Sequence, residues 1–138
     1  MIINEFNILA LFHTYNQDYF NGVLPIPKIK ISSSYRTLGY FHCESDGFDG
    51  YYDETIEISG NYDYTESQLR DILVHEMIHY YLLFNGTDKK CSHGRKFKNM
   101  MNEFNLRYGM NISVRVDLTP FKVRKGKSKL MFNICTFF

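Results

Sequence analysis

The sequence predicts one α+β domain in which three helices pack on a small mixed or antiparallel β-sheet. The length of 138 residues suits a single domain with one core. Hydrophobic residues make up 44% of the chain and aromatic residues 17%, which is typical of a folded protein and not of a disordered one. Segments with helical periodicity and segments with strand alternation both occur, and turn residues separate them.

The N-terminal part predicts a helix followed by three strands. In residues 5–20 apolar side chains recur at helical spacing, and Asn21-Gly22 ends the helix. Residues 28–32 follow two prolines and alternate apolar and polar, which predicts a short strand. Residues 37–43 and 52–59 are rich in β-forming side chains, and the turn-rich loop between them predicts a hairpin. The expected apolar face of the helix is Phe6, Leu9, Phe12 or His13, and Tyr19 or Phe20.

A second helix has clear start and stop signals. Thr65 and Gln68 can form a capping box, in which the Thr65 hydroxyl accepts from the Gln68 N–H and the Gln68 side chain reaches back. The helix then runs to about Phe84, and Asn85-Gly86 closes it.

The rest of the chain predicts a third helix, a strand and a basic end. Ser92 is the expected N-cap of the helix, and Gly109 its end. Residues 111–118, NISVRVDL, predict a last clear strand. We expect residues 1–120 to form the domain and residues 121–138 a basic C-terminal extension, whose apolar run can pair as a final strand. The apolar stripe of the helix is Phe97, Met101, Phe104 and Tyr108.

The N-terminus has neither the basic region nor the unbroken apolar run of a signal peptide, and no segment reaches the roughly 18 apolar residues of a membrane span. We therefore expect a cytoplasmic protein without a membrane partner. The three cysteines, Cys43, Cys91 and Cys135, have no CxxC spacing, so they predict reduced thiols and neither a disulfide framework nor a zinc ribbon.

The net charge is only +1, but the end of the chain is basic, because no acidic residue follows Asp117. A basic cluster can bind the phosphates of DNA, and it can equally be a solvated chain end. Both interpretations stay open at this point. The basic residues concerned are Lys122, Arg124, Lys125, Lys127 and Lys129.

The segment VHEMIHYYLLFNGTDKKCSHGRKF, residues 74–97, places three histidines and a glutamate close together. Helix residues four apart lie on one face, about 5 to 6 Å apart between Cβ atoms, so His75 and His79 can bind one metal ion. Glu76 points about 100° around the helix axis, which places its carboxylate beside the ion without coordinating it. This arrangement suits a general base for a metal-bound water.

A catalytic zinc site has three protein ligands and an open position for water, so a third ligand is needed. His13 and His42 are far upstream, whereas His93 follows His79 by 14 residues. A tight connection between two antiparallel helices would bring His93 back over the first helix. We expect His93 to be the third ligand, with Glu103, further along the same helix, as the fallback. The apolar flanks of the motif favour this site over the alternative, in which the histidines are ordinary polar residues.

The segment LVHEMIHYYLLFNGTDKKCSHGRKFKNMMNEFN, residues 73–105, resembles the SprT-like metalloproteases, whose eukaryotic members include Spartan. The shared features are a hydrophobic HExxH helix, a variable loop, an HG motif and a second helix. The likeness extends to YNQDYFNGVLP, LGYF, IEIS and NISV, and so covers roughly residues 5–117.

This resemblance implies a small zincin-like α+β metalloprotease domain and a zinc metalloendopeptidase. It implies His75, His79 and His93 as zinc ligands and Glu76 as the catalytic residue. Because Spartan degrades proteins crosslinked to DNA, it also implies a role in DNA–protein crosslink repair. Many family members carry a cysteine zinc ribbon after the catalytic part, and this chain departs from them because Cys135 stands alone there.

The leading hypothesis is peptide hydrolysis. Zinc would lower the pKa of its bound water towards about 7, and Glu76 would accept the proton and pass it to the leaving amine. The substrate is expected to lie extended along an edge strand, either TLGYFHC or TIEIS. Tyr80, Tyr81 and Tyr108 are candidates for stabilising the oxyanion.

Two alternatives remain. The first is a nucleic-acid-associated binding module with a mainly structural zinc site, in which the basic C-terminal segment is the working surface. The second is a metal-dependent hydrolase that acts on another bond. It ranks last because the sequence has neither a phosphate-binding glycine loop nor a carboxylate cluster for a second metal.

Overall fold

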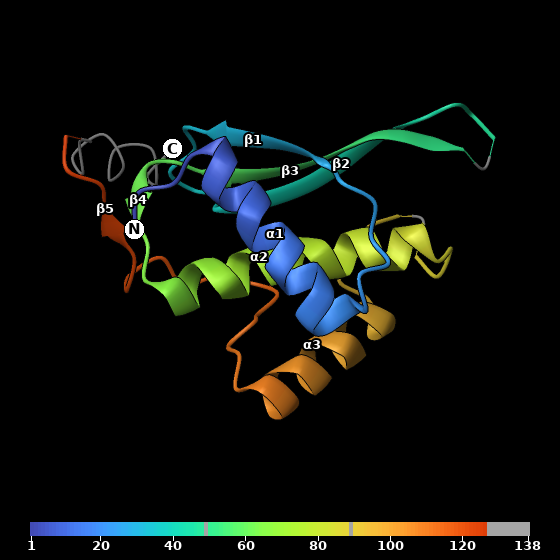
Figure 1. The fold of residues 1–138 in the computed structure, drawn as a ribbon. Helices are drawn as coiled ribbons and strands as arrows, with labels where there is room; N and C mark the ends of the chain where they lie inside the picture. Colours follow the sequence, from blue (N-terminus) through green and yellow to red (C-terminus); the bar gives the residue numbers. More distant parts are fainter. Residues whose placement is uncertain (49, 89, 127–138) are drawn as a thin grey trace.

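The computed structural model describes residues 1–48, 50–88 and 90–126 of the chain, and within them it has three helices and five strands (Figure 1). The predicted class, an α+β fold with three helices and a small mixed sheet, is confirmed. In chain order the elements are α1 (Glu5–Phe20), β1 (Lys28–Ser32), β2 (Gly39–Ser45), β3 (Tyr51–Ser59), β4 (Tyr62–Asp63), α2 (Glu66–Phe84), α3 (Arg95–Tyr108) and β5 (Lys122–Val123).

The main sheet of the described residues has the strand order β1-β3-β2, with β1 parallel and β2 antiparallel to β3. The predicted hairpin is present, although β2 begins at Gly39 and continues to Ser45. Ile56 and Ile58 are fully buried on one face of β3, as predicted, because strand residues two apart point to the same side. Since β3 is the central strand, the TIEIS segment cannot be the substrate-binding edge, and only the TLGYFHC segment of the two candidates lies at an edge.

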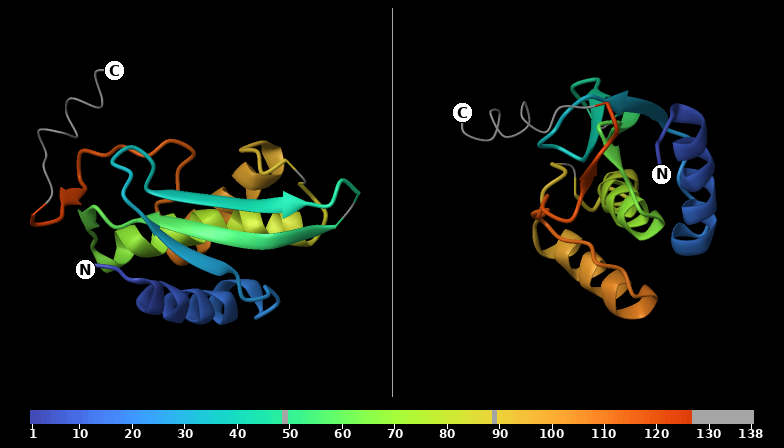
Figure 2. Two further views of the ribbon diagram at one scale, coloured as in Figure 1. Left: turned by 90° about the horizontal axis from the view of Figure 1, so that it is seen from above. Right: turned by 90° about the vertical axis from the view of Figure 1, so that its left-hand side faces the viewer.

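The helices lie on one side of this sheet (Figure 1). α2 contacts β2 and β3 on its upper side and α3 on its lower side, and α1 packs against both β1 and α2. The end-on view in Figure 2 shows α2 between the sheet and α3. The capping box of Thr65 and Gln68 begins this helix, and the C-cap Asn85 followed by the left-handed Gly86 ends it, as predicted. α2 is therefore the central element, and its side chains are buried along most of its length.

The buried face of α1 differs from the prediction. Its buried residues are Ile8, Phe12, Asn16 and Phe20, whereas Phe6 is 88% exposed. The reason is that a polar residue belongs to the buried face. The Asn16 side chain donates to the Leu24 carbonyl at 3.0 Å and accepts from the Leu24 N–H at 3.2 Å, and so fixes the turn between α1 and β1.

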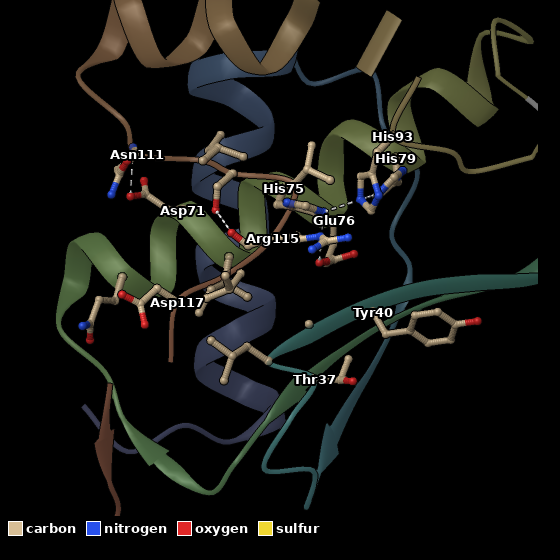
Figure 3. A pocket seen from close by; sticks show the side chains of 18 of the residues that line it. Thr37, Tyr40, Asp71, His75, Glu76, His79, His93, Asn111, Arg115 and Asp117 are labelled. Atoms are coloured by element: carbon tan, nitrogen blue, oxygen red, sulfur yellow. Dashed lines mark hydrogen bonds and ion pairs between the residues drawn. The ribbon is translucent and has the colours of Figure 1, made fainter. Parts of the chain in front are cut away.

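The predicted strand at residues 111–118 is wrong, because this segment forms no strand in the structure. Its alternation of apolar and polar residues is typical of a strand, but its backbone groups bond to side chains and not to a neighbouring strand. Asn105 donates to the Ile112 carbonyl at 2.9 Å and accepts from the Ile112 N–H at 2.8 Å, and Asp71 accepts from the Asn111 N–H at 3.1 Å. The segment therefore crosses α2 as an irregular chain that bends at Val114 and Arg115, here called the 111–117 segment (Figure 3).

The predicted cap of α3 is also wrong. Gly94 occupies the N-cap position without a side-chain hydrogen bond, while the Ser92 hydroxyl donates to Asp88 at 3.0 Å. The helix ends at the left-handed Gly109, as predicted. Of its expected apolar stripe, Phe97 and Phe104 are buried and Met101 and Tyr108 are half-buried.

The short strand β5 pairs with β4 and attaches the chain after residue 120 to the body. The division into a domain of residues 1–120 and an extension stays a prediction. The terminal apolar run, Lys127, Lys129 and Cys135 lie outside the described residues. Among the described helices, none has both the length and the apolar character needed to cross a membrane.

Candidate metal centre and its cleft

Three histidine rings meet at one point between α2 and the start of α3. His75 and His79 lie one turn apart on α2, and His93 is the residue before the N-cap of α3. The Nε2 atom of His93 lies 3.1 Å from that of His75 and 3.0 Å from that of His79 (Figure 3). The structure thus brings together the three histidines that the sequence singles out, in positions suited to binding one metal ion.

The number of N–H donors on the three imidazole rings favours a metal ion at this point. A neutral imidazole has one N–H, so the Nε2 atom of His93 can donate to at most one of the two nitrogens that face it. At most one of these two close contacts can therefore be a well-aligned hydrogen bond, and a metal ion between the three nitrogens would satisfy all of them. The backbone of Ser113 lies beside the His75 ring, where it acts against the lowering of the pKa of that ring by burial. The donor set therefore fits a metal ion.

The charge state of the histidines is also suitable. Burial, together with the neighbouring rings, lowers the pKa of His75 to about 3, and burial followed by the effect of His93 lowers the pKa of His79 to about 4. Burial lowers the pKa of His93 as well. All three imidazoles are therefore neutral at pH 7, which is the form that binds a metal.

A single aromatic ring supports all three imidazoles. Phe97, on the first turn of α3, is fully buried. Its ring centroid lies 4.8 Å from that of His75, 4.4 Å from that of His79 and 4.9 Å from that of His93. The ring stacks on His79 with an interplanar angle of 26°. Phe97 therefore does more than anchor α3 in the core, because it also limits how the three rings can rotate.

Glu76 lies beside the histidines under the sheet. Its side chain is buried, and its Oε2 atom lies 4.0 Å from the Nε2 atom of His75. Gly39, the first residue of β2, permits this position, because a Cβ atom there would lie 2.8 Å from the Glu76 Oε2 atom. Burial raises the pKa of Glu76 to about 8. The carboxyl group is thus close to the histidines and has a high affinity for a proton.

The other candidates from the sequence lie elsewhere. Glu103 is exposed and pairs with Arg107 at 3.6 Å, which removes the fallback ligand from the site. His42 pairs with Glu57 at 2.8 Å, and His13 is exposed on α1. The three tyrosines proposed for the oxyanion do not line the cleft. Tyr80 donates to the Pro25 carbonyl, Tyr81 packs on Phe20, and Tyr108 packs on Tyr19.

The metal centre lies at the floor of an open cleft of about 1000 Å³. Residues 36–41, at the start of β2, form one wall, and the 111–117 segment with Pro120 and Phe121 forms the other. Side chains of α2 form the floor between them (Figure 3). Because β2 is an edge strand and pairs only with β3 among the described residues, its outer backbone faces this cleft. An extended peptide can therefore reach the histidines along β2.

Cys43 and Cys91 are free thiols, as the sequence predicts. Burial raises the pKa of both, that of Cys91 to about 11, so they are protonated at neutral pH. Cys91 lines the end of the cleft near His93 and has a left-handed backbone with φ 51°.

Several residues of the site were missed in the sequence. Ser113 lies beside the His75 ring, while Asn105 and Asp71 bind the backbone of the segment that contains Ser113, and no local motif marks these three residues. Arg115 lines the cleft from a segment that was expected to be a strand. Of the site residues that the sequence analysis missed, only Gly39 could have been recognised, because an isolated glycine in a strand pattern indicates a close approach by another group.

The α+β fold and three histidines positioned for a metal ion together define a zincin-like metal-binding domain. Comparison with protein families agrees, since the model of the SprT-like family matches residues 8–116, which is most of the chain. The protein belongs to the SprT-like family, and the resemblance noted in the sequence is confirmed. A search of curated proteins found no match. Membership supports a metallopeptidase-type domain.

Proposed function

We propose that this protein is a zinc-dependent metalloendopeptidase that hydrolyses protein substrates. The observation that supports this best is the convergence of three histidine Nε2 atoms beside the buried Glu76 carboxylate, at the floor of a cleft with a free strand edge. Family membership supports the same class of activity.

His75, His79 and His93 would hold the ion, and a set of three neutral imidazoles favours zinc. When bound, zinc lowers the pKa of a coordinated water to about 7 and polarises the carbonyl of the substrate.

Glu76 would act as the general base and then as the general acid. Its raised pKa, caused by burial, gives the carboxylate a strong affinity for a proton, and a nearby cation would bring that pKa down towards neutrality. A carboxylate with a pKa near the working pH can take a proton from water and return it to the leaving amine. Gly39 leaves the space that this carboxylate needs.

The edge of β2 would hold the substrate by backbone pairing. Residues 39–41 of β2 line the cleft close to Glu76, so a peptide paired there would pass over the histidines. Such pairing recognises the backbone and leaves the side chains to the two walls.

The direct test is Glu76→Gln, which keeps the shape of the side chain but removes its basicity. We expect this variant to bind zinc and fold normally while its kcat for an unfolded protein substrate falls by about 10²- to 10⁴-fold. Glu103→Gln is the matched control, because Glu103 is an exposed glutamate outside the cleft. Unchanged cleavage by Glu76→Gln would sink the assignment.

A nucleic-acid-associated module with a structural zinc is the second candidate, and only the basic segment favours it. Two of its members are engaged by the body: Lys122 belongs to β5, and Arg124 donates to the carbonyls of Asn61 at 2.8 Å and Gly60 at 3.3 Å. If the remaining basic residues bind DNA, proteins bound or crosslinked to DNA are one proposed group of substrates. The cytoplasm is the proposed location. If changing Lys125, Lys127 and Lys129 to Ala leaves DNA affinity and its salt dependence unaltered, the DNA proposal fails.

A further inference from the structure

Two arginine side chains line the metal-centre cleft from opposite walls. Arg36 belongs to the wall that leads into β2, and Arg115 belongs to the 111–117 segment. Figure 3 shows Arg115 in the pocket, in the region of Glu76. Both residues are exposed, and within the described ranges neither guanidinium has an acidic side chain or a carbonyl as partner. Each is a fixed positive charge free to bind a ligand.

Arg70, the third arginine of the described cleft lining, has a structural role and so serves as a comparison. Its guanidinium contacts Asp71 at 3.0 Å, and Asp71 also accepts from the Asn111 N–H at 3.1 Å. This pair holds the 111–117 segment on α2. Arg36 and Arg115 have no comparable role in the described residues, so their charges are not used to hold the fold together.

Among the described residues that line the cleft, unpaired basic side chains outnumber unpaired acidic ones. The lining contains the acidic residues Asp71, Glu76 and Asp117. Asp71 is paired with Arg70, and Glu76 is the proposed base. Asp117 accepts from the Thr119 N–H at 2.9 Å. In the part of the lining that the structure describes it is the one remaining carboxylate, opposite the two free arginines and the exposed Lys90. The metal ion would add further positive charge between the walls.

Both arginines lie close to the reacting centre along the chain. Arg36 is three residues before Gly39, which packs on Glu76, and Arg115 is two residues after Ser113, whose backbone lies beside His75. Even a fully extended chain would span at most about 11 Å and 7 Å over these offsets, and the chain bends at both Arg36 and Arg115. A guanidinium at such a distance meets a substrate side chain within two or three positions of the cleaved bond.

We propose that Arg36 and Arg115 determine specificity and select peptide segments with Asp or Glu close to the cleaved bond. The inference rests on the proposed peptidase function and adds the substrate class. A guanidinium binds a carboxylate through two parallel N–H donors, which gives a stronger contact than a neutral pair. A peptide is favoured over nucleic acid as the source of the anion, because the two arginines sit on facing walls beside the edge of β2 and do not form one continuous basic surface.

The experiment uses the full chain loaded with zinc and three peptides that differ only near the cleaved bond, with Glu, Gln or Lys there. We expect kcat/KM for the Glu peptide to exceed that for the Gln peptide by about tenfold at low salt, mostly through KM, and the ratio to shrink as NaCl is added. Arg115→Ala and Arg36→Ala should each reduce this ratio, and Arg115→Glu should move the preference to the Lys peptide. Arg107→Ala, an arginine outside the cleft, should leave the ratio unchanged.

The outcomes separate this proposal from the proposed function. Equal cleavage of the Glu and Gln peptides by the wild-type protein overturns the specificity and leaves the peptidase standing. If no peptide is cleaved, the peptidase fails, and fluorescence anisotropy with zinc-loaded Glu76→Gln decides the specificity: equal affinity for the Glu and Gln peptides overturns it. If the arginine variants weaken binding of a short single-stranded oligonucleotide and leave the Glu-to-Gln ratio intact, the arginines bind phosphates and the proposal is also overturned.

Discussion

Gly39 and Glu76 are packed so closely that a methyl group on Gly39 would overlap the catalytic candidate: the added Cβ atom would lie 2.8 Å from the Glu76 Oε2 atom. It would also lie 2.9 Å from the Ile72 Cγ2 atom. Gly39, the first residue of the edge strand β2, and the carboxylate of the proposed base therefore occupy adjoining space. The position of Glu76 is set by β2 as much as by α2.

This contact predicts the effect of Gly39→Ala. The Glu76 carboxylate should move away from the histidines while all three rings stay in place, so kcat should fall by about 10²-fold, as for a displacement of about 1 Å. Zinc content, measured on the purified variant, should be unchanged. The double variant Gly39→Ala/Glu76→Gln should lose no more activity than Glu76→Gln alone, because both changes act through one carboxylate. Additive losses would show that Gly39 acts in another way.

Phe97 offers a second prediction, since its ring touches all three histidines. Phe97→Leu should lower the free energy of unfolding by about 1 to 3 kcal/mol and zinc affinity by about 10- to 100-fold, because the imidazoles lose the surface that orients them. Phe104→Leu is the control, a buried phenylalanine of the same helix that packs on Phe20 and not on the histidines. Zinc titration with a competing chelator gives the measurement. Equal zinc affinity in the two variants would contradict the role assigned to Phe97.

Asn105 provides a third prediction, which concerns the wall of the cleft. Its side chain makes two hydrogen bonds to the backbone of Ile112, at 2.9 Å and 2.8 Å. Asn105→Ala leaves both backbone groups without this partner, which should cost about 1 to 3 kcal/mol of stability and loosen the 111–117 segment. KM should rise while zinc is retained. Asn102→Ala, an exposed asparagine of the same helix, should change neither quantity, and an unchanged KM in Asn105→Ala would show that the wall does not depend on this anchor.

The pKa values predict how the stability of the metal-free protein depends on pH. The three histidines have folded-state pKa values below the ordinary value of 6.5, owing mainly to burial. As the pH falls below 6.5, the unfolded chain takes up protons that the folded protein excludes, so the free energy of unfolding falls. Glu76 acts in the opposite sense. Its pKa is raised from 4.5 to about 8, so stability is lost as the pH rises through that range.

These effects combine into a maximum. Between pH 4.5 and 6.5 His75 and His79 together outweigh the one glutamate, and well above pH 6.5 the effect of Glu76 dominates, so the metal-free protein should be most stable near pH 6.5. Urea unfolding with a chelator at pH 5.5, 6.5 and 8 measures this. In Glu76→Gln the decline between pH 6.5 and 8 should disappear. A decline of the same size in that variant would assign it to another group.

Much of the fold could be predicted because its signals are local. The capping box at Thr65, the prolines before β1 and the left-handed residues after each helix depend on neighbours in sequence, and the corresponding elements appear where expected. The cluster of His75, His79 and His93 could also be predicted, since one helix and the connection that follows it determine their positions. Two of the errors arose where a distant polar partner decides the structure, whereas the wrong cap of α3 reflects a local bond from Ser92 to Asp88.

Two cases illustrate this. Asn16 is buried because it binds the backbone of Leu24, so a face chosen by hydrophobicity alone is rotated from the true one. The 111–117 segment has the composition of a strand, but Asn105 and Asp71 satisfy its backbone groups in place of a neighbouring strand. The tyrosines proposed to stabilise the oxyanion do not line the cleft, because each contacts groups that are distant in sequence. The sequence alone does not show which tyrosine rings pack away from the cleft.

The second wall of the cleft is formed by residues that follow α3, and these residues come after all three candidate metal ligands in the sequence. The residues that form the two walls therefore lie on both sides of the metal-binding motif in the sequence, residues 36–41 before it and the 111–117 segment after it. A variant altered only in residues 114–117 should keep its zinc in an elemental assay and still lose part of the proposed peptidase activity. Zinc stoichiometry alone is consequently a poor measure of how much of a preparation is competent, and active-site titration with a bound peptide is the better standard.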